Sequence, residues 1–295
     1  MDFLKYRYLW ISISLVVIIS GITYGLVTGY RFDIDFMGGT RIQADLKTEF
    51  DNNEIEDMVY EIIELNPLVQ KMSGGDAAVS ITTDVITEEQ ANKIIEQLKI
   101  KFPDMSEPTT RNIQPAFGKN LIESSILAVT VSLLFTLVYV AIRFKTLGFS
   151  AAITALVALL HDMLVILSFY GIFKLPINSS FVAVALTIVG YSINDTIIIY
   201  DRIRENKRKI TKSTDLAKTI NDSINQTLTR TINTTISTLT AVTVVLVFAY
   251  IFNQQVLKEF SLPLTIGLVS GSYSTIFIAT SLWYMLENRN LKKAK

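Results

Sequence analysis

Six long apolar stretches, separated by polar segments, run along the chain. A helix rises about 1.5 Å per residue, so about 20 apolar residues cross the roughly 30 Å hydrocarbon core of a bilayer. The pattern therefore predicts six membrane-spanning helices, at about residues 8–28, 121–142, 147–169, 179–200, 231–252 and 260–286. The first stretch follows Lys5 and Arg7 but is longer than a signal-peptide core, and no Ala-x-Ala site follows it, so we expect an uncleaved span.

The long polar segment between the first two spans has strand and helix patterns in turn. Apolar residues alternate in four short runs and recur at helical spacing in two longer ones. Strands are expected at 40–46, 69–72, 77–82 and 108–113, and helices at 52–65 and 87–102. Thr87 and Gln90 fit a capping box at the start of the second helix. The order β-α-β-β-α-β, with a turn at 74–76, predicts an α+β ferredoxin-like domain.

Basic residues gather in the connections that fall on one side of the predicted spans. They are Lys5, Arg7, Arg143, Lys145, seven residues between Arg202 and Lys218, and those between Arg289 and Lys295, whereas the opposite connections hold only Lys174 and Lys258. The excess of Lys and Arg predicts that both termini are cytoplasmic and that the α+β domain is extracytoplasmic. A loop as long as residues 29–119 would cross whatever its charge, so its net charge of −8 (9 basic, 17 acidic) does not bear on orientation.

The fold class predicted is a polytopic α-helical membrane protein with six transmembrane helices and one extracytoplasmic domain. Its expected parts are an N-terminus with the first helix (1–28), the α+β domain (29–119), the remaining helices (120–288) with a basic cytoplasmic loop (201–229), and a basic cytoplasmic tail (289–295).

The composition agrees with a membrane protein and excludes several chemistries. Half of the 295 residues are hydrophobic, and the mean hydropathy is +0.39. The chain has no cysteine, which excludes disulfides and thiol catalysis, and its single histidine, His161, excludes a multi-histidine metal site. Gly38 and Gly39 are not followed by the Gly-Lys-Ser/Thr of a phosphate-binding loop. We therefore expect no metal site and no ATP site.

One carboxylate, Asp195, stands inside the apolar run 180–200. An ionisable group at this depth costs about 2.5–3.5 kcal/mol on insertion scales, and such groups usually mark an ion or substrate pathway. A buried carboxylate with a cation nearby can bind and release an ion near the working pH. The alternative is an aspartate that is permanently paired and holds two helices together.

Arg230 is the natural partner of Asp195. It begins a helix face on which Thr227, Thr234, Ser237 and Thr238 recur, and it enters the membrane from the side on which the fourth span ends. Asp195 lies about 7 Å from the end of its span, so the two charges can meet at similar depth. Alternatively, Arg230 is an interfacial arginine that reaches to lipid headgroups.

Four further residues are candidates for a relay to Asp195. Tyr191 lies one turn before it and Asn194 beside it, and His161 and Asp162 lie in the middle of the third span. Neighbours on a helix point about 100° apart. We therefore expect one of His161 and Asp162 to reach the relay and the other to meet a different helix; a hydrogen-bonded buried pair is the alternative.

Two flanking patterns concern packing. Leu216, Ile220, Ile224, Leu228 and Ile232 recur every four residues, which suggests an amphipathic helix at the interface before the fifth span. Gly267 and Gly271 form a Gly-x-x-x-Gly pair, which is typical of closely packed spans.

Four segments resemble one known family. Residues 189–206 (VGYSINDTIIIYDRIREN) resemble the signature of SecF within the SecD/SecF family of protein-export membrane proteins. Residues 32–40 (FDIDFMGGT) are similar to a motif shared by both groups, and 227–235 (TLTRTINTT) and 267–279 (GLVSGSYSTIFIA) are similar to the fifth and sixth spans of SecF. The likeness covers essentially the whole chain in order.

The resemblance implies a function in protein export. It implies one half of a resistance-nodulation-division-type (RND) unit in the bacterial cytoplasmic membrane, completed by a SecD-like subunit. Such a unit works with a SecYEG-type channel and uses an ion gradient to help draw an unfolded polypeptide outward. The family's transport carboxylate falls on Asp195, and its other functional positions fall on Arg230 and Thr234. The implied protein is not an enzyme, has lipids but no nucleic acid as further partners, and needs no cofactor beyond the coupling ion, H⁺ or Na⁺.

Two alternatives remain open. The first is an RND-type ion-coupled exporter of small molecules or lipids. The second is a structural scaffold in which Asp195 is a fixed ion pair.

Overall fold

The computed structural model describes residues 2–72, 77–208, 216–252 and 254–293. The predicted turn at 74–76, residues 209–215 of the predicted basic loop and the last two residues of the predicted tail lie outside the described residues.

Among the described residues, six helical spans are long and apolar enough to cross a membrane, as predicted. They are α1 (Arg7–Thr28), α5 (Pro115–Arg143), α6 (Phe149–Phe173), α7 (Ser179–Lys207), α8 (Leu216–Ile251) and a sixth span that joins α9 (Gln255–Tyr273), the π-helical turn η4 (Ser274–Ala279) and α10 (Thr280–Lys293). A short 3₁₀ turn, η1 (Leu4–Tyr6), precedes α1, and another, η2 (Lys145–Leu147), precedes α6.

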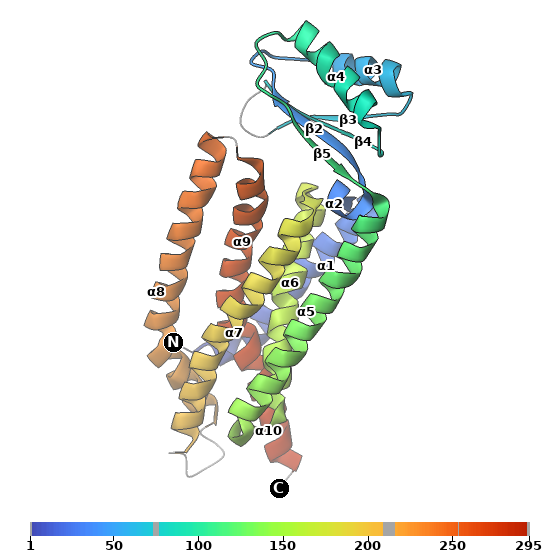
Figure 1. Cartoon of the computed structure of the whole chain (residues 1–295). Helices are drawn as coiled ribbons and strands as arrows, with labels where there is room; N and C mark the ends of the chain where they lie inside the picture. Colours follow the sequence, from blue (N-terminus) through green and yellow to red (C-terminus); the bar gives the residue numbers. More distant parts are fainter. Residues whose placement is uncertain (1, 73–76, 209–215, 253, 294–295) are drawn as a thin grey trace.

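The bundle has an inner and an outer set of helices (Figure 1). The apolar parts of α6, α7 and the sixth span are about half buried, whereas those of α1, α5 and α8 are mostly exposed. Gly267 and Gly271 of α9 lie against Ile188 and Ser192 of α7, so the predicted close packing is confirmed and its partner is α7. Most of the buried residues of the bundle therefore come from α6, α7 and the sixth span.

The prediction of a separate interfacial helix before the fifth span is wrong. Residues from Leu216 onward belong to one continuous helix, α8. Leu216, Ile220 and Ile224 are buried and pack with Phe144 and Tyr200 in a core cluster of the bundle. Their four-residue repeat forms the inward face of a long helix. An apolar stripe of this kind can pack on protein or on lipid, so the sequence pattern alone does not distinguish the two.

The segment between α1 and α5 contains a compact α/β domain, in the predicted order of elements. It consists of β2 (Gly39–Asp45), α3 (Asn52–Ile63), β3 (Leu68–Lys71), β4 (Ala78–Thr83), α4 (Glu88–Lys101) and β5 (Thr109–Ile113), each within two residues of its predicted bounds. The strands form an antiparallel sheet in the order β3-β4-β2-β5, and both helices lie on one face of it (Figure 1). Thr87 and Gln90 form the predicted capping box of α4.

A short junction, unpredicted from the sequence, joins this domain to the bundle. The strand β1 (Arg31–Phe32) pairs in parallel with β6 (Pro176–Ile177), which precedes α7. The one-turn helix α2 (Ile34–Met37) follows β1 and leads into β2 through Gly38 and Gly39, both at positive φ, which glycine adopts readily. At the other side of the domain, β5 runs directly into α5.

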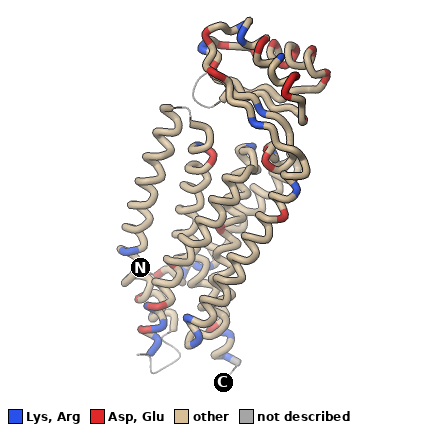
Figure 2. The backbone as a smooth tube through the Cα atoms, viewed as in Figure 1, with Lys and Arg blue, Asp and Glu red and all other residues tan. Residues whose placement is uncertain are grey.

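Charged residues lie mainly away from the middle of the bundle. Figure 2 shows many of the bundle's Lys and Arg at the end opposite the α/β domain, and Figure 1 shows both termini toward that end. Buried carboxylates between the helices are therefore exceptions that need a physical explanation.

Candidate ion-binding site

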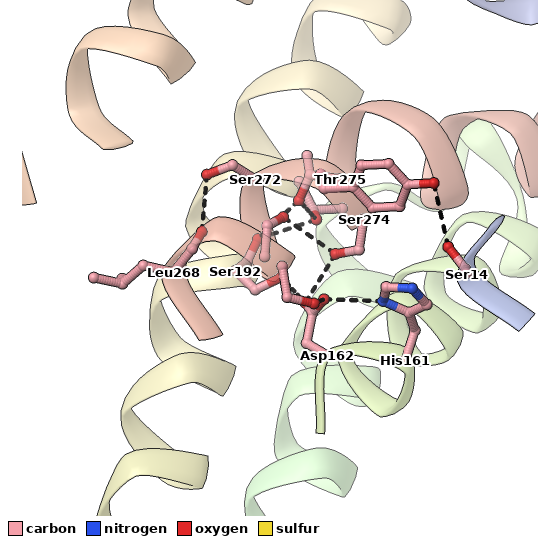
Figure 3. A network of polar contacts seen from close by, with 12 residues as sticks. Ser14, His161, Asp162, Ser192, Leu268, Ser272, Ser274 and Thr275 are labelled. Atoms are coloured by element: carbon pink, nitrogen blue, oxygen red, sulfur yellow. Dashed lines mark hydrogen bonds and ion pairs between the residues drawn. The ribbon is translucent and has the colours of Figure 1, made fainter. Parts of the chain in front are cut away.

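Asp162 of α6 is the centre of a hydrogen-bonded cluster inside the bundle (Figure 3). Its side chain is fully buried. One carboxylate oxygen accepts from Ser270 Oγ at 2.7 Å, and the other accepts from Ser192 Oγ at 2.7 Å and Ser274 Oγ at 2.8 Å. Ser192 comes from α7, and Ser270 and Ser274 come from α9 and η4 of the sixth span. The carboxylate of Asp162 therefore joins three spans, counting α6, which carries it.

The serines reach Asp162 because of how the sixth span is wound. Ser270 and Ser274 are four residues apart and therefore lie on one helix face. The π-helical turn begins at Ser274, and the next residue, Thr275, contacts Thr196 of α7 at 2.9 Å between hydroxyl oxygens. Single π-turns are frequent at functional sites. Here the turn lies where the sixth span contacts both α6 and α7.

His161 contacts its neighbour Asp162, and its ring also stacks on Tyr273 of α9, with 6.1 Å between the ring centroids. Its Nδ1 lies 3.1 Å from the first of these carboxylate oxygens, so the pair is hydrogen bonded and buried, as in the alternative interpretation from sequence. An ionised Asp162 requires the proton on Nδ1, because a carboxylate only accepts. Four donors then surround the carboxylate, an arrangement that suits a charged group in a dry interior.

Asp195 of α7 lies in the opposite situation. It is also fully buried, but among the described residues neither of its carboxylate oxygens has a hydrogen-bond partner. The neighbouring polar groups are committed elsewhere: Tyr191 donates to Thr235 of α8 at 3.3 Å, Ser192 to Asp162, and Thr196 pairs with Thr275. A buried carboxylate that is charged and unpaired costs several kcal/mol, about as much as breaking a buried ion pair.

A second unpaired polar group lies at the level of Asp195. α7 and α8 are antiparallel, because Tyr191 contacts Thr235 while Arg202, farther along α7, contacts Gln226, which is earlier on α8. Asp195 follows Tyr191 by four residues, and Thr231 precedes Thr235 by four residues. In this antiparallel register Thr231 therefore lies opposite Asp195. Thr231 is 1% exposed, and its hydroxyl has no partner among the described residues.

Arg230 lies near Asp195 but is not bonded to it. Its charge acts on the Asp195 carboxylate, yet the described contacts include no ion pair between them. Arg230 instead lines a polar cleft of about 630 Å³ between the end of α7 and the start of α8, together with Asn194, Asp201 and Arg202. Thr234 is half-buried and donates to the Arg230 carbonyl at 2.8 Å. The roles predicted for Arg230, Thr234 and Asn194 therefore stay predictions.

The sequence interpretation did not identify the cluster around Asp162. Ser192, Ser270, Ser274 and Thr231 are not among the candidate residues that the sequence predicts. The only signal available was the four-residue spacing of Ser270 and Ser274. Small hydroxyl residues are common at spans that pack closely, so this spacing alone does not indicate a carboxylate partner.

Comparison with known proteins identifies the family. The family model described as "Protein export membrane protein SecD/SecF, C-terminal" matches residues 93–289. The protein translocase subunit SecF of Borreliella burgdorferi is 34% identical over 295 residues, with 95% of each chain covered. That of Alicyclobacillus acidocaldarius is 31% identical over 96% of this chain and 91% of its own.

Longer proteins of the same kind also match nearly the whole of this chain, which covers 39% of their length. The protein translocase subunit SecDF of Bacillus subtilis is 33% identical over 99% of this chain but only 39% of its own length. The crystal structure of a translocon-associated SecDF from Thermus superposes with a TM-score of 0.85 at 26% identity, over 98% of this chain and 39% of that one. This likeness supports the predicted RND-type arrangement of six helices. The chain is a multi-pass membrane protein that belongs to the SecD/SecF family of protein-export membrane proteins.

Proposed function

We propose that this chain uses a transmembrane ion gradient to promote protein export, together with a SecD-like subunit and a SecYEG-type channel. Its substrate is an unfolded polypeptide that emerges from the channel, and it is not an enzyme. Two facts support this: the relatives are named protein translocase subunits, and the chain spans most of SecF but 39% of SecDF. Because they are named so, the alternative of a small-molecule or lipid exporter is not favoured.

The observation that carries the ion coupling is the contrast between the two buried aspartates. Each carboxylate oxygen of Asp162 has two hydrogen-bond partners, so a cation or an added proton would have to displace one of them. Asp195 has no protein partner at either oxygen. A carboxyl group in this state is stable when it is protonated or binds a cation, and unstable when it is bare and charged. Asp195 is therefore the group that binds and releases the coupling ion, either H⁺ or Na⁺.

Arg230 supplies the second state of the cycle. When α7 and α8 bring Arg230 against Asp195, the ion pair holds the carboxylate charged and the coupling ion leaves. When the two are apart, as in this structure, Asp195 requires the ion. Thr231 contributes a hydroxyl oxygen at the same level, which can accept from a protonated carboxyl or serve as a ligand to a cation. Tyr191 joins α7 to α8 through its hydrogen bond to Thr235, and His161 is bonded to Asp162 of its own helix; neither carries an ion in this scheme.

The orientation follows from the charge of the connections. Lys and Arg lie at the end of the bundle opposite the α/β domain (Figure 2). In the bacterial cytoplasmic membrane this end faces the cytoplasm, so both termini are cytoplasmic and the α/β domain is extracytoplasmic. The cleft lined by Arg230 and Asn194 then opens toward the cytoplasm, and it offers an aqueous route to the depth of Asp195. Arg204 and Lys207 in the last turn of α7 then lie at the level where anionic lipid headgroups attract positive charge.

The test is export of a reporter protein through membranes that contain the full complex, with and without an ion gradient. Asp195→Asn preserves the size of the side chain but cannot ionise, so it should leave assembly intact and abolish the stimulation by the gradient. Glu123→Gln, an equal change at an exposed position of α5, should retain it. Full stimulation in an assembled Asp195→Asn complex would show that Asp195 is structural. Imposing a proton and a sodium gradient separately identifies the ion.

A further inference from the structure

Asp35 lies where the α/β domain meets the bundle, and it contacts both. Its side chain is 6% exposed. One carboxylate oxygen accepts from the backbone N–H of Ser179 at 3.0 Å and from the hydroxyl of the same residue. The other oxygen lies 3.8 Å from the guanidinium of Arg111 on β5. A single carboxylate thus joins an edge strand of the domain's sheet to the first residue of α7.

The contact with α7 is directional. Ser179 is the first helical residue, and its N–H is one of the amides that a helix cannot satisfy internally. Asn178, the residue before the helix, caps a different amide, that of Phe181. Asp35 is therefore a second cap, supplied from outside the helix. A carboxylate at a helix N-terminus is also favoured by the helix dipole, so this end of α7 is held to α2.

The segment that carries Asp35 is tightly connected to the sheet. α2 leads into β2 through Gly38 and Gly39, and Gly118 of α5 lies against the carbonyl of Phe36 with no room for a side chain. Asp33, which caps α2, forms a buried ion pair with Arg41 of β2, whose guanidinium remains charged. A displacement of α2 must therefore move β2, one of the two central strands of the sheet.

The domain has room to move over the rest of the bundle. A cleft of about 500 Å³ separates the face of the sheet that carries Gln43 and Gln70 from Gln255 and Glu259 at the start of α9. The sheet is thus held at the junction and is not packed directly on α9. A shift of the junction can open or narrow this cleft.

The helix held by Asp35 is the one that carries Asp195. We infer that Asp35 is the positioning residue that transmits a movement of α7 to the α/β domain, through its bonds to Ser179 on one side and Arg111 on the other. This inference rests on the proposed function, because it assigns a path to the movement that ion binding at Asp195 starts. Asp35 itself binds no ion in this scheme.

The sharpest variant removes the donors of α7 and leaves the helix intact. Ser179→Pro removes the backbone N–H and the hydroxyl together. Proline is favoured at the first position of a helix, and the extended backbone of Asn178 (φ −133°, ψ −172°) is compatible with a following proline. Ser180→Ala, at the next residue, is the matched control. Asp35→Asn is the second variant: it keeps the shape of the side chain but turns an amide N–H toward either Ser179 or Arg111.

The experiment uses the full complex in vesicles across which an ion gradient can be imposed. Spin labels at Glu96→Cys on α4 and Val256→Cys on α9, both exposed, report the distance across the cleft. This chain has no cysteine of its own, so the two sites are unique in it. Ion uptake by the same vesicles reports whether Asp195 still binds and releases the ion.

In the unaltered complex and in Ser180→Ala, the gradient should shift the label distance, and Asp195→Asn should abolish the shift. Ser179→Pro should abolish the shift while ion uptake persists, a separation that a merely stabilising contact would not produce. A full shift in Ser179→Pro overturns the inference. If that variant does not assemble, Asp35→Asn decides: a reduced shift with ion uptake retained supports the inference, and an undiminished shift overturns it. No shift in the unaltered complex refutes the proposed function, and the inference with it.

Discussion

At the scale of the residue, the same side chain has two different states in one membrane interior. Asp162 and Asp195 are both fully buried, on neighbouring helices. Three serines and a histidine surround Asp162, and their donors take the place of the water that a charged carboxylate loses on burial. Asp195 has no such donors. The hydrogen bonds around each aspartate, rather than its depth, decide which one is free to exchange an ion.

The two threonines near Arg230 provide a matched test of this site. Thr231 is buried at the level of Asp195, whereas Thr234 is half-buried and bonds to its own helix. Thr231→Val keeps the shape but removes a hydroxyl worth about 1 kcal/mol, so ion affinity should fall about fivefold. Thr234→Val should change it little. The measurement is ion uptake by the reconstituted complex as a function of ion concentration; equal effects of both substitutions would contradict the register.

Asp162 should matter for stability rather than for ion exchange. In Asp162→Asn an amide NH₂ group replaces one carboxylate oxygen. It would face serine hydroxyls that donate to that oxygen in the unaltered protein, so a buried donor would be left without an acceptor. The expected loss is about 1–3 kcal/mol of unfolding free energy. Thermal unfolding of the purified chain in detergent measures it, with Glu123→Gln on exposed α5 as the control. An unchanged melting temperature would mean that the serine cluster is not formed in the membrane protein.

The sequence indicates one of these two aspartates far better than the other. Asp195 is conspicuous because the cost of a charge in an apolar run depends only on local hydropathy. The environment of Asp162 depends on which faces of α6, α7 and α9 meet, and helical periodicity does not determine this. Neighbouring residues on a helix point about 100° apart, which separates the Cβ atoms of His161 and Asp162. Their side chains are nevertheless long enough for His161 Nδ1 to lie 3.1 Å from a carboxylate oxygen of Asp162.

At the scale of the element, close packing of α9 on α7 places the serines. A side chain at Gly267 would collide with Ile188, whereas a Cβ added at Gly190 of α7 would meet no neighbouring element among the described residues within 4 Å. Gly267→Ala should therefore cost about 1–3 kcal/mol through overpacking, while Gly190→Ala should be nearly neutral. Thermal unfolding of the isolated chain distinguishes them; a neutral Gly267→Ala would show that the two helices are farther apart than described.

The elements themselves were largely predictable, because each has a local signal. Spans were found from hydropathy, and the α/β domain from alternation, helical spacing and the Thr87 capping box. The pairing of β1 with β6 and the cap from Asp35 to Ser179 were not, since they join residues about 145 positions apart. Two-residue strands have too few positions to show an alternating pattern.

At the scale of the whole molecule, the α/β domain has a core separate from that of the bundle. Its buried residues come only from its own strands, helices and loops. Residues 34–117 expressed alone should therefore give a mixed α/β circular dichroism spectrum and a cooperative melt. Ile81→Ala, at a fully buried position, should cost about 2–5 kcal/mol, and Ile100→Ala, at an exposed one, much less. A random-coil spectrum would contradict independent folding.

The orientation of the molecule can be tested on the same chain, which has no cysteine. Single cysteines at Glu96 in α4 and at Asn290 in α10 occupy exposed positions at opposite ends. The positive-inside rule predicts that an impermeant thiol reagent added outside sealed cells labels the first and not the second. Labelling of Asn290→Cys in sealed cells would reverse the orientation.

Binding and release of the ion by Asp195 is the central claim, and infrared difference spectroscopy of the purified protein tests it most directly. A buried carboxyl that takes up a proton gains a carbonyl stretch that a carboxylate lacks. During a pH titration we expect such a band, lost in Asp195→Asn and retained in Glu123→Gln. If Na⁺ is the coupling ion, added sodium should shift the titration of that band. A difference spectrum unchanged by Asp195→Asn, with or without sodium, would contradict the account.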